Sequence, residues 1–175
     1  MSHTALRIPV REAETIVRRR ALAAGSPYQP QDGGVLAHVA LLDPFLPEDA
    51  LTDGVLADLE RVFEQSDVFG FELTEVAVSP GGVVYLTPEP ATLFSELTFA
   101  VLEVFPELRA GIADLADLAP TLVVPVLPGE DAASLQAELA VRLPLTSRAV
   151  NATLVRVAER DTRTLSTFAL GSSAA

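Results

Sequence analysis

The chain has 175 residues, of which 49% are hydrophobic and 21% are charged. This length and composition exclude a disordered polymer and predict a folded protein with a substantial buried core. Aspartate and glutamate number 24 against 12 lysine plus arginine, and the resulting net charge of −12 argues against nucleic acid as a partner.

The hydrophobic pattern predicts an alternation of strands and helices along the chain. For the first half we expect a strand at residues 5–10, a helix at 11–24, a loop at 25–34, a strand at 36–42, a helix at 52–65, and a hairpin formed by strands at 69–78 and 83–87. For the second half we expect a helix at residues 90–105, a loop with a short helical turn at 106–119, a strand at 121–126 and a helix at 131–141. A hairpin formed by strands at 150–158 and 164–169 and a small polar tail at 171–175 complete the chain.

A repeat relates the two halves. The apolar run 37–42, Ala-His-Val-Ala-Leu-Leu, returns at 120–125 as Pro-Thr-Leu-Val-Val-Pro, and each copy leads into a Leu-Pro pair and an acidic helix start. Each half then contributes a motif strand, a helix and a hairpin. Two such units packed about a pseudo-twofold axis would place their motif strands side by side, with a central cleft between them.

These runs resemble the paired His-x-Thr/Ser motifs of the two-histidine phosphoesterase superfamily, which includes bacterial 2′-5′ RNA ligase-like proteins and cyclic nucleotide phosphodiesterases. The resemblance covers nearly the whole chain and includes the run 82–90, Gly-Val-Val-Tyr-Leu-Thr-Pro-Glu-Pro, which is similar to the family's central hairpin strand. It implies an α+β fold with two lobes, in which two mostly antiparallel sheets are flanked by helices. We treat residues 1–175 as a single two-lobed domain.

The resemblance also implies roles for the motif positions. In the family one histidine is the general base, the other is the general acid, and the two hydroxyl residues hold phosphate oxygens. In this chain only His38 matches, because Thr121 replaces the second histidine and Ala40 and Val123 replace the two hydroxyl residues. The two-proton mechanism therefore lacks one catalyst and both hydroxyl donors.

The candidate site follows from these positions. Side chains alternate between the two faces of a strand, so His38 and Ala40 share one face of the first motif strand. Thr121 and Val123 likewise share one face of the second motif strand. We therefore expect an apolar cleft that contains one histidine and one hydroxyl group. Tyr85 is a further candidate ligand-binding residue. Each has a structural alternative: His38 as a satisfied, partly buried histidine, Thr121 as an ordinary strand residue and Tyr85 as a core aromatic.

Arg7 and Arg109 could supply positive charge to an anionic ligand, although nothing in their spacing separates them from solvated arginines. Asp43 has the opposite strand parity from His38, which disfavours it as a carboxylate partner.

The remaining composition limits other sites and the location. With no cysteine and only two histidines, the chain has no thiolate nucleophile and no histidine-rich zinc site, and we expect neither a metal nor another cofactor. No signal-peptide pattern begins the chain, and no apolar run approaches the ~20 residues that cross a bilayer. We therefore expect a cytoplasmic monomer or weak dimer that does not associate with membranes.

The leading functional hypothesis is a diverged family member that has lost phosphodiesterase activity and binds or transforms a small molecule in the central cleft. A recruited enzyme would use His38 as its acid or base, in a cyclisation or isomerisation for example. The alternatives are a non-catalytic binding protein and a residual cyclic nucleotide or RNA 2′,3′-cyclic phosphodiesterase.

Overall fold

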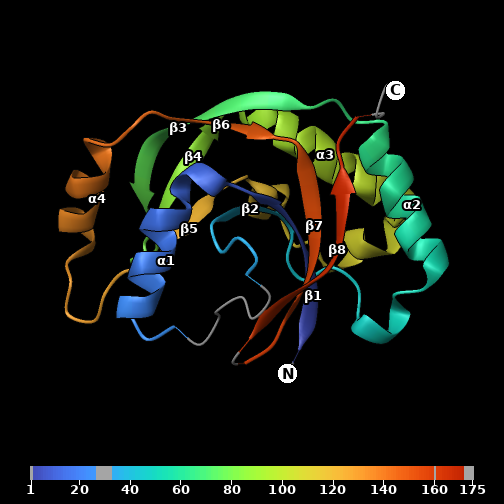
Figure 1. The fold of residues 1–175 in the computed structure, drawn as a ribbon, viewed down its shortest axis with the longest axis horizontal. Coiled ribbons are helices and arrows are strands. Elements are labelled where there is room, and N and C mark those ends of the chain that lie inside the picture. Colours follow the sequence, from blue (N-terminus) through green and yellow to red (C-terminus); the bar gives the residue numbers. More distant parts are fainter. Residues whose placement is uncertain (1, 27–32, 160, 172–175) are drawn as a thin grey trace.

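Two antiparallel four-stranded sheets form the frame of the protein (Figure 1). The computed structural model describes residues 2–26, 33–159 and 161–171. One sheet has the strand order β2-β1-β7-β8 and the other has the order β5-β4-β3-β6. The sheets curve into an arch, with α4 at one end and α2 at the other (Figure 1). The α+β, two-lobed fold expected from the sequence is confirmed.

The elements largely follow the hydrophobic pattern. The strands are β1 His3–Pro9, β2 His38–Leu42, β3 Phe69–Val78, β4 Val84–Glu89, β5 Leu122–Val124, β6 Leu145–Ala149, β7 Asn151–Val157 and β8 Thr162–Ala169. The α-helices are α1 Glu14–Ala23, α2 Asp53–Glu64, α3 Ala91–Val104 and α4 Ala132–Ala140, and short 3-10 helices precede α1 and α2 and occupy Pro106–Gly111 and Leu115–Leu118.

Side-chain caps explain where two of the helices begin. The Thr52 hydroxyl accepts a hydrogen bond from the Val55 N–H at 3.3 Å, at the start of α2. The Asp131 carboxylate accepts one from the Ser134 N–H at 3.2 Å, at the start of α4. Each cap satisfies a backbone donor that the first turn of a helix cannot pair internally.

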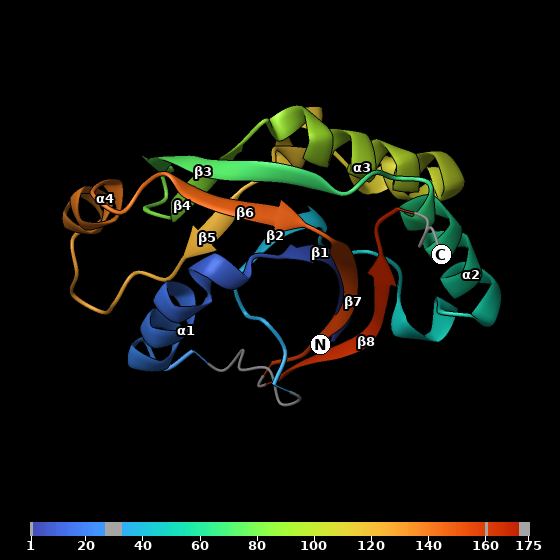
Figure 2. The ribbon, with the colours of Figure 1, turned by 45° about the horizontal axis from the view of Figure 1, so that its top comes forward.

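The sheets do not follow the two halves of the chain as expected. The hairpin β3–β4 pairs with the second motif strand β5, whereas β7–β8 pairs with the first motif strand β2 through β1. Strand β6, which the sequence pattern did not predict, pairs with β3, and the chain then passes directly into β7 of the other sheet (Figure 2). Each lobe is therefore built from both halves.

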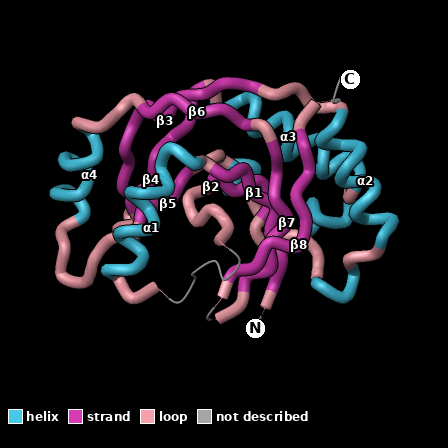
Figure 3. Tube along the Cα trace, viewed as in Figure 1, coloured by secondary structure: helices cyan, strands magenta, loops and turns pink. Residues whose placement is uncertain are grey.

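The two motif strands occupy edges of their sheets. Strand β2 ends one sheet and β5 ends the other, and these two strands contact one another without pairing in a ladder. The expected side-by-side placement of the motif strands is confirmed, and Figure 3 shows the two strands meeting near the middle of the arch.

A continuous apolar core joins the sheets, and α3 lies at its centre. The fully buried ring of Phe94 packs edge-on against Phe71 and Phe69, with ring centroids 4.9 and 5.1 Å apart. One turn later, the buried Thr98 hydroxyl donates to the Phe94 carbonyl at 3.2 Å and lies 3.4 Å from the Leu41 carbonyl of β2. Helix α3 thus contacts β3 of one sheet and β2 of the other.

Some expectations fall on residues outside the described part of the chain. These include most of the expected loop 25–34 and all but the first residue of the tail 171–175. Among the described residues, no helix has both the length and the apolar character needed to cross a membrane.

We expect Phe94→Ala to lower the free energy of unfolding by about 3–5 kcal/mol, because it removes a fully buried ring from the centre of the core. Urea denaturation followed by circular dichroism measures this loss. Phe99→Ala is the matched control, since Phe99 lies on the same helix but is 40% exposed. A loss in Phe94→Ala no larger than in Phe99→Ala would contradict the central role of α3.

Candidate functional site

His38 opens β2 and has a defined tautomer. Its Nδ1 lies 2.7 Å from the Leu36 carbonyl oxygen. A carbonyl can only accept a hydrogen bond, so Nδ1 carries the proton and Nε2 of the neutral ring has the lone pair. Nε2 is therefore the ring nitrogen that can accept a hydrogen bond or a proton from a ligand.

The surroundings of His38 keep the ring neutral. Burial lowers the pKa of His38 from 6.5 to about 4, and the nearby positive charge of Arg7 acts in the same direction. The Leu36 carbonyl and Asp43 oppose this shift without cancelling it. At neutral pH His38 is consequently a hydrogen-bond acceptor at Nε2 and not a cation.

His38 lines a pocket of about 150 Å³. Its described lining contains no acidic side chain, although the chain as a whole has a net charge of −12. The polar side chains that line it come from β1, β2, β7, β8 and the turn after β1, and are Arg7, Arg11, His38, Asn151, Thr153, Thr164 and Thr167.

The ladder explains why these side chains share one face. Arg7 lies opposite Ala40 on one side and opposite Thr153 on the other, and Thr153 lies opposite Thr167. Residues paired across antiparallel strands project to the same face, and Asn151 joins them two positions before Thr153. The result is a polar row across the sheet.

Arg7 forms an ion pair with Asp43, the residue that directly follows the motif strand β2. Its Nη2 donates to Asp43 Oδ2 at 3.1 Å, and Asp43 Oδ1 lies 2.6 Å from His3 Nε2. Burial lowers the pKa of Arg7, and its ion pair with Asp43 opposes that change. Asp43 therefore partners Arg7 and His3, and has no direct hydrogen bond to His38, in agreement with the strand-parity argument.

The other candidate residues lie elsewhere. Ala40 is next to the pocket on the same strand, while Tyr85 and Val123 are cross-strand partners on the second sheet, and Thr121 immediately precedes β5. None of these four is in the described lining of the His38 pocket. Their ligand-binding roles remain predictions.

The polar residues of β7 and β8 were missed by the sequence analysis. The signal was present in β7, where Asn151 and Thr153 alternate with the buried Ala152 and Leu154. That alternation indicates a half-solvated strand but not which site it faces. The sequence analysis considered Arg7, with Arg109, as a possible source of positive charge for an anionic ligand, but could not distinguish it from a solvated arginine. In the structure the Arg7 side chain is only 11% exposed.

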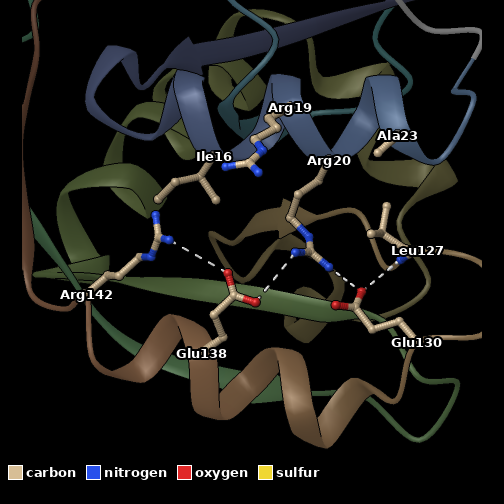
Figure 4. A pocket seen from close by; sticks show the side chains of 8 residues that line it. All are labelled: Ile16, Arg19, Arg20, Ala23, Leu127, Glu130, Glu138 and Arg142. Atoms are coloured by element: carbon tan, nitrogen blue, oxygen red, sulfur yellow. Dashed lines mark hydrogen bonds and ion pairs between the residues drawn. The ribbon is translucent and has the colours of Figure 1, made fainter.

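A second pocket, of about 330 Å³, lies between α1 and α4 (Figure 4). Arg20 of α1 pairs with Glu130, and a hydrogen bond from Arg20 and one from the Leu127 N–H lower the pKa of Glu130. Glu138 of α4 lies between Arg20 and Arg142, at 3.9 and 3.7 Å. These charges largely pair among themselves, so the cluster links the two helices.

No group of three or more histidine, aspartate or glutamate side chains is arranged to hold a metal ion in the part of the chain that the structure describes. The polar groups that the described residues bring to the His38 pocket are a neutral imidazole, two guanidinium groups, an amide and hydroxyl groups.

We expect the His38 signal in an NMR titration to have its midpoint near pH 4, with the Nδ1–H tautomer seen in long-range ¹H–¹⁵N spectra. The unfolded chain binds more protons than the folded one between pH 6.5 and about 4, so the free energy of unfolding should fall as the pH drops through that range. His38→Gln should reduce this loss.

His3→Gln assigns the two histidine signals, since the chain has only two. A midpoint for His38 at or above 6.5 would contradict a desolvated, neutral ring.

Comparisons with known proteins agree with this architecture. E. coli LigT complexed with 3′-AMP is 14% identical, with a TM-score of 0.59 over 97% of this chain and 98% of LigT. TT0787 of Thermus thermophilus is 18% identical, with a TM-score of 0.59 over 99% of this chain and 100% of that one. These TM-scores establish a common fold. No curated protein matches the chain. A sequence model of the 2′-5′ RNA ligase superfamily matches residues 8–161, and the chain belongs to that superfamily.

Proposed function

We propose that this protein binds a small anionic molecule in the His38 pocket and no longer cleaves phosphodiesters by the two-histidine mechanism. The observation that carries the proposal is a neutral His38 beside Arg7 in a pocket whose described lining residues include no acidic side chain, in a chain whose second motif has Thr121 in place of histidine. A threonine hydroxyl does not titrate near neutral pH and cannot act as the second proton-transfer group.

The state of His38 favours binding over catalysis. A general base works best when its pKa lies near the working pH. The pKa of His38 is about 4, so at neutral pH the ring is a weak base and is almost never protonated as an acid. Its Nε2 is suited to accepting a hydrogen bond from a ligand, which supports a binding protein ahead of a recruited acid/base enzyme.

The charge of the pocket indicates the ligand's sign. Among the described residues that line the pocket, only Arg7 and Arg11 are charged, and they attract an anion in an otherwise acidic protein. The superfamily relatives support the same class, because E. coli LigT has been seen complexed with phosphate, 3′-AMP, ATP and NADP⁺. Phosphate-bearing small molecules are therefore the first compounds to test.

A residual cyclic phosphodiesterase is the second candidate. The observation in its favour is the Nδ1–H tautomer of His38, which leaves Nε2 able to take a proton from an attacking water. Its weakness is the lack of a motif-derived acid and of both hydroxyl donors, whose losses act on the same transition state.

Ligand binding is tested by thermal shift and isothermal calorimetry with phosphate, 3′-AMP and ATP. We expect at least one to raise the melting temperature, and His38→Ala to weaken that ligand by about tenfold because a hydrogen bond to Nε2 is lost. Arg148→Ala, at an exposed position on β6 of the other sheet, is the matched control. An unchanged melting temperature with all of these compounds and with a wider set of anionic metabolites would contradict the proposal.

Loss of the old chemistry is tested by restoring the motifs. We expect the wild type to hydrolyse 2′,3′-cyclic nucleotides no faster than His38→Ala does. The triple variant Ala40→Thr, Thr121→His, Val123→Thr should gain activity, since general acid–base groups typically contribute about 10²–10⁴-fold. Hydrolysis by the wild type that disappears in His38→Ala would instead establish the residual phosphodiesterase.

A further inference from the structure

Two residues that line the His38 pocket each carry a buried polar atom that has no hydrogen-bond partner among the described residues. These atoms are Nε of Arg7 and Oδ1 of Asn151. A buried polar atom without a partner is costly, so such pairs of atoms in a native structure are satisfied by water or by a ligand. Both atoms require a partner, and both belong to residues that line one pocket.

The position of Arg7 leaves its Nε free for this purpose. The ion pair with Asp43 is made through Nη2 and does not use the Nε–H. Asp43 also reduces the net charge that Arg7 presents, while the exposed Arg11 adds a second cation to the lining. A guanidinium held in this way is suited to one oxyanion.

Asn151 offers the opposite polarity. An Nε–H can only donate a hydrogen bond and an amide oxygen can only accept one. Asn151 is two residues from Thr153, which is paired with Arg7, so both atoms belong to the same face of the sheet. A ligand that satisfies both must combine an acceptor with a donor.

The volume limits the size of the group that enters. The pocket measures about 150 Å³. Sites for drug-sized ligands occupy about 300–1,000 Å³, so the pocket can enclose only a part of a molecule as large as a nucleotide. A compact group of a few heavy atoms does fit.

We propose that the His38 pocket selects a compact molecule that carries an oxyanion beside a hydroxyl group, with Arg7 Nε donating to the oxyanion and Asn151 Oδ1 accepting from the hydroxyl. This inference rests on the proposed function and names the ligand class for the same pocket. Thr153 and Thr167, aligned in the ladder, supply hydroxyl groups that can donate or accept beside these two contacts.

The test compares glycerol 3-phosphate with propyl phosphate by isothermal calorimetry, because the two probes share the anion and the carbon chain but only the first has hydroxyl groups. We expect wild type to prefer glycerol 3-phosphate by about tenfold, the effect of one satisfied buried acceptor. Asn151→Ala should abolish that preference and leave propyl phosphate binding unchanged.

Arg7→Lys keeps the positive charge but removes the Nε–H, and we expect it to weaken both probes by about tenfold. Thr146→Ala, exposed on β6, is the control for both substitutions. Melting temperatures near that of wild type establish that each variant is folded. Equal wild-type affinity for the two probes, or wild-type binding by both variants, would overturn the inference and would mean that water satisfies the two buried atoms.

The outcomes also separate this inference from the proposed function. If neither probe binds but another anion gives a His38-dependent thermal shift, the inference fails and the proposed function stands. If the hydroxyl preference and its loss in Asn151→Ala are observed but His38→Ala binds normally, the inference stands and the role proposed for His38 fails.

Discussion

The packing of α3 across both sheets is the constraint on which the rest of the structure depends. Phe94 packs against β3 of one sheet, and Thr98, one turn later, reaches the Leu41 carbonyl of β2 in the other. Because one helix contacts both, the sheets share one core and cannot move apart without exposing it. That shared core holds β2 beside β5 and sets the edge from which His38 projects.

The exchange of strands between the lobes adds to this coupling. Strand β3 follows the first motif strand in sequence but pairs beside β4 in the second sheet, while β7 pairs beside β1 in the first. The polar row of the His38 pocket therefore combines Arg7 from the start of the chain with Asn151 and Thr153 from near its end. Only closure of this long-range ladder brings these groups together.

Electrostatics distinguish the pocket from the remainder of the protein. A net charge of −12 makes the chain as a whole unsuited to anions, but the pocket lining has two arginines and no described acidic residue. The same surroundings keep His38 neutral, since burial and Arg7 both disfavour its protonated form. Arg7 thus contributes both to the proposed binding of an anion and to the neutral state of His38 near pH 7.

The sequence by itself determined most of the secondary structure, the α+β two-lobed fold and the asymmetry of the motifs. Apolar periodicity and the caps at Thr52 and Asp131 are local properties, readable without a partner strand. It did not reveal β6, whose five residues carry too little alternation to be distinguished from a loop. Only the tertiary structure decided that Arg7 and Asn151 lie beside His38, because pairing between strands far apart in sequence selects which residues share a face.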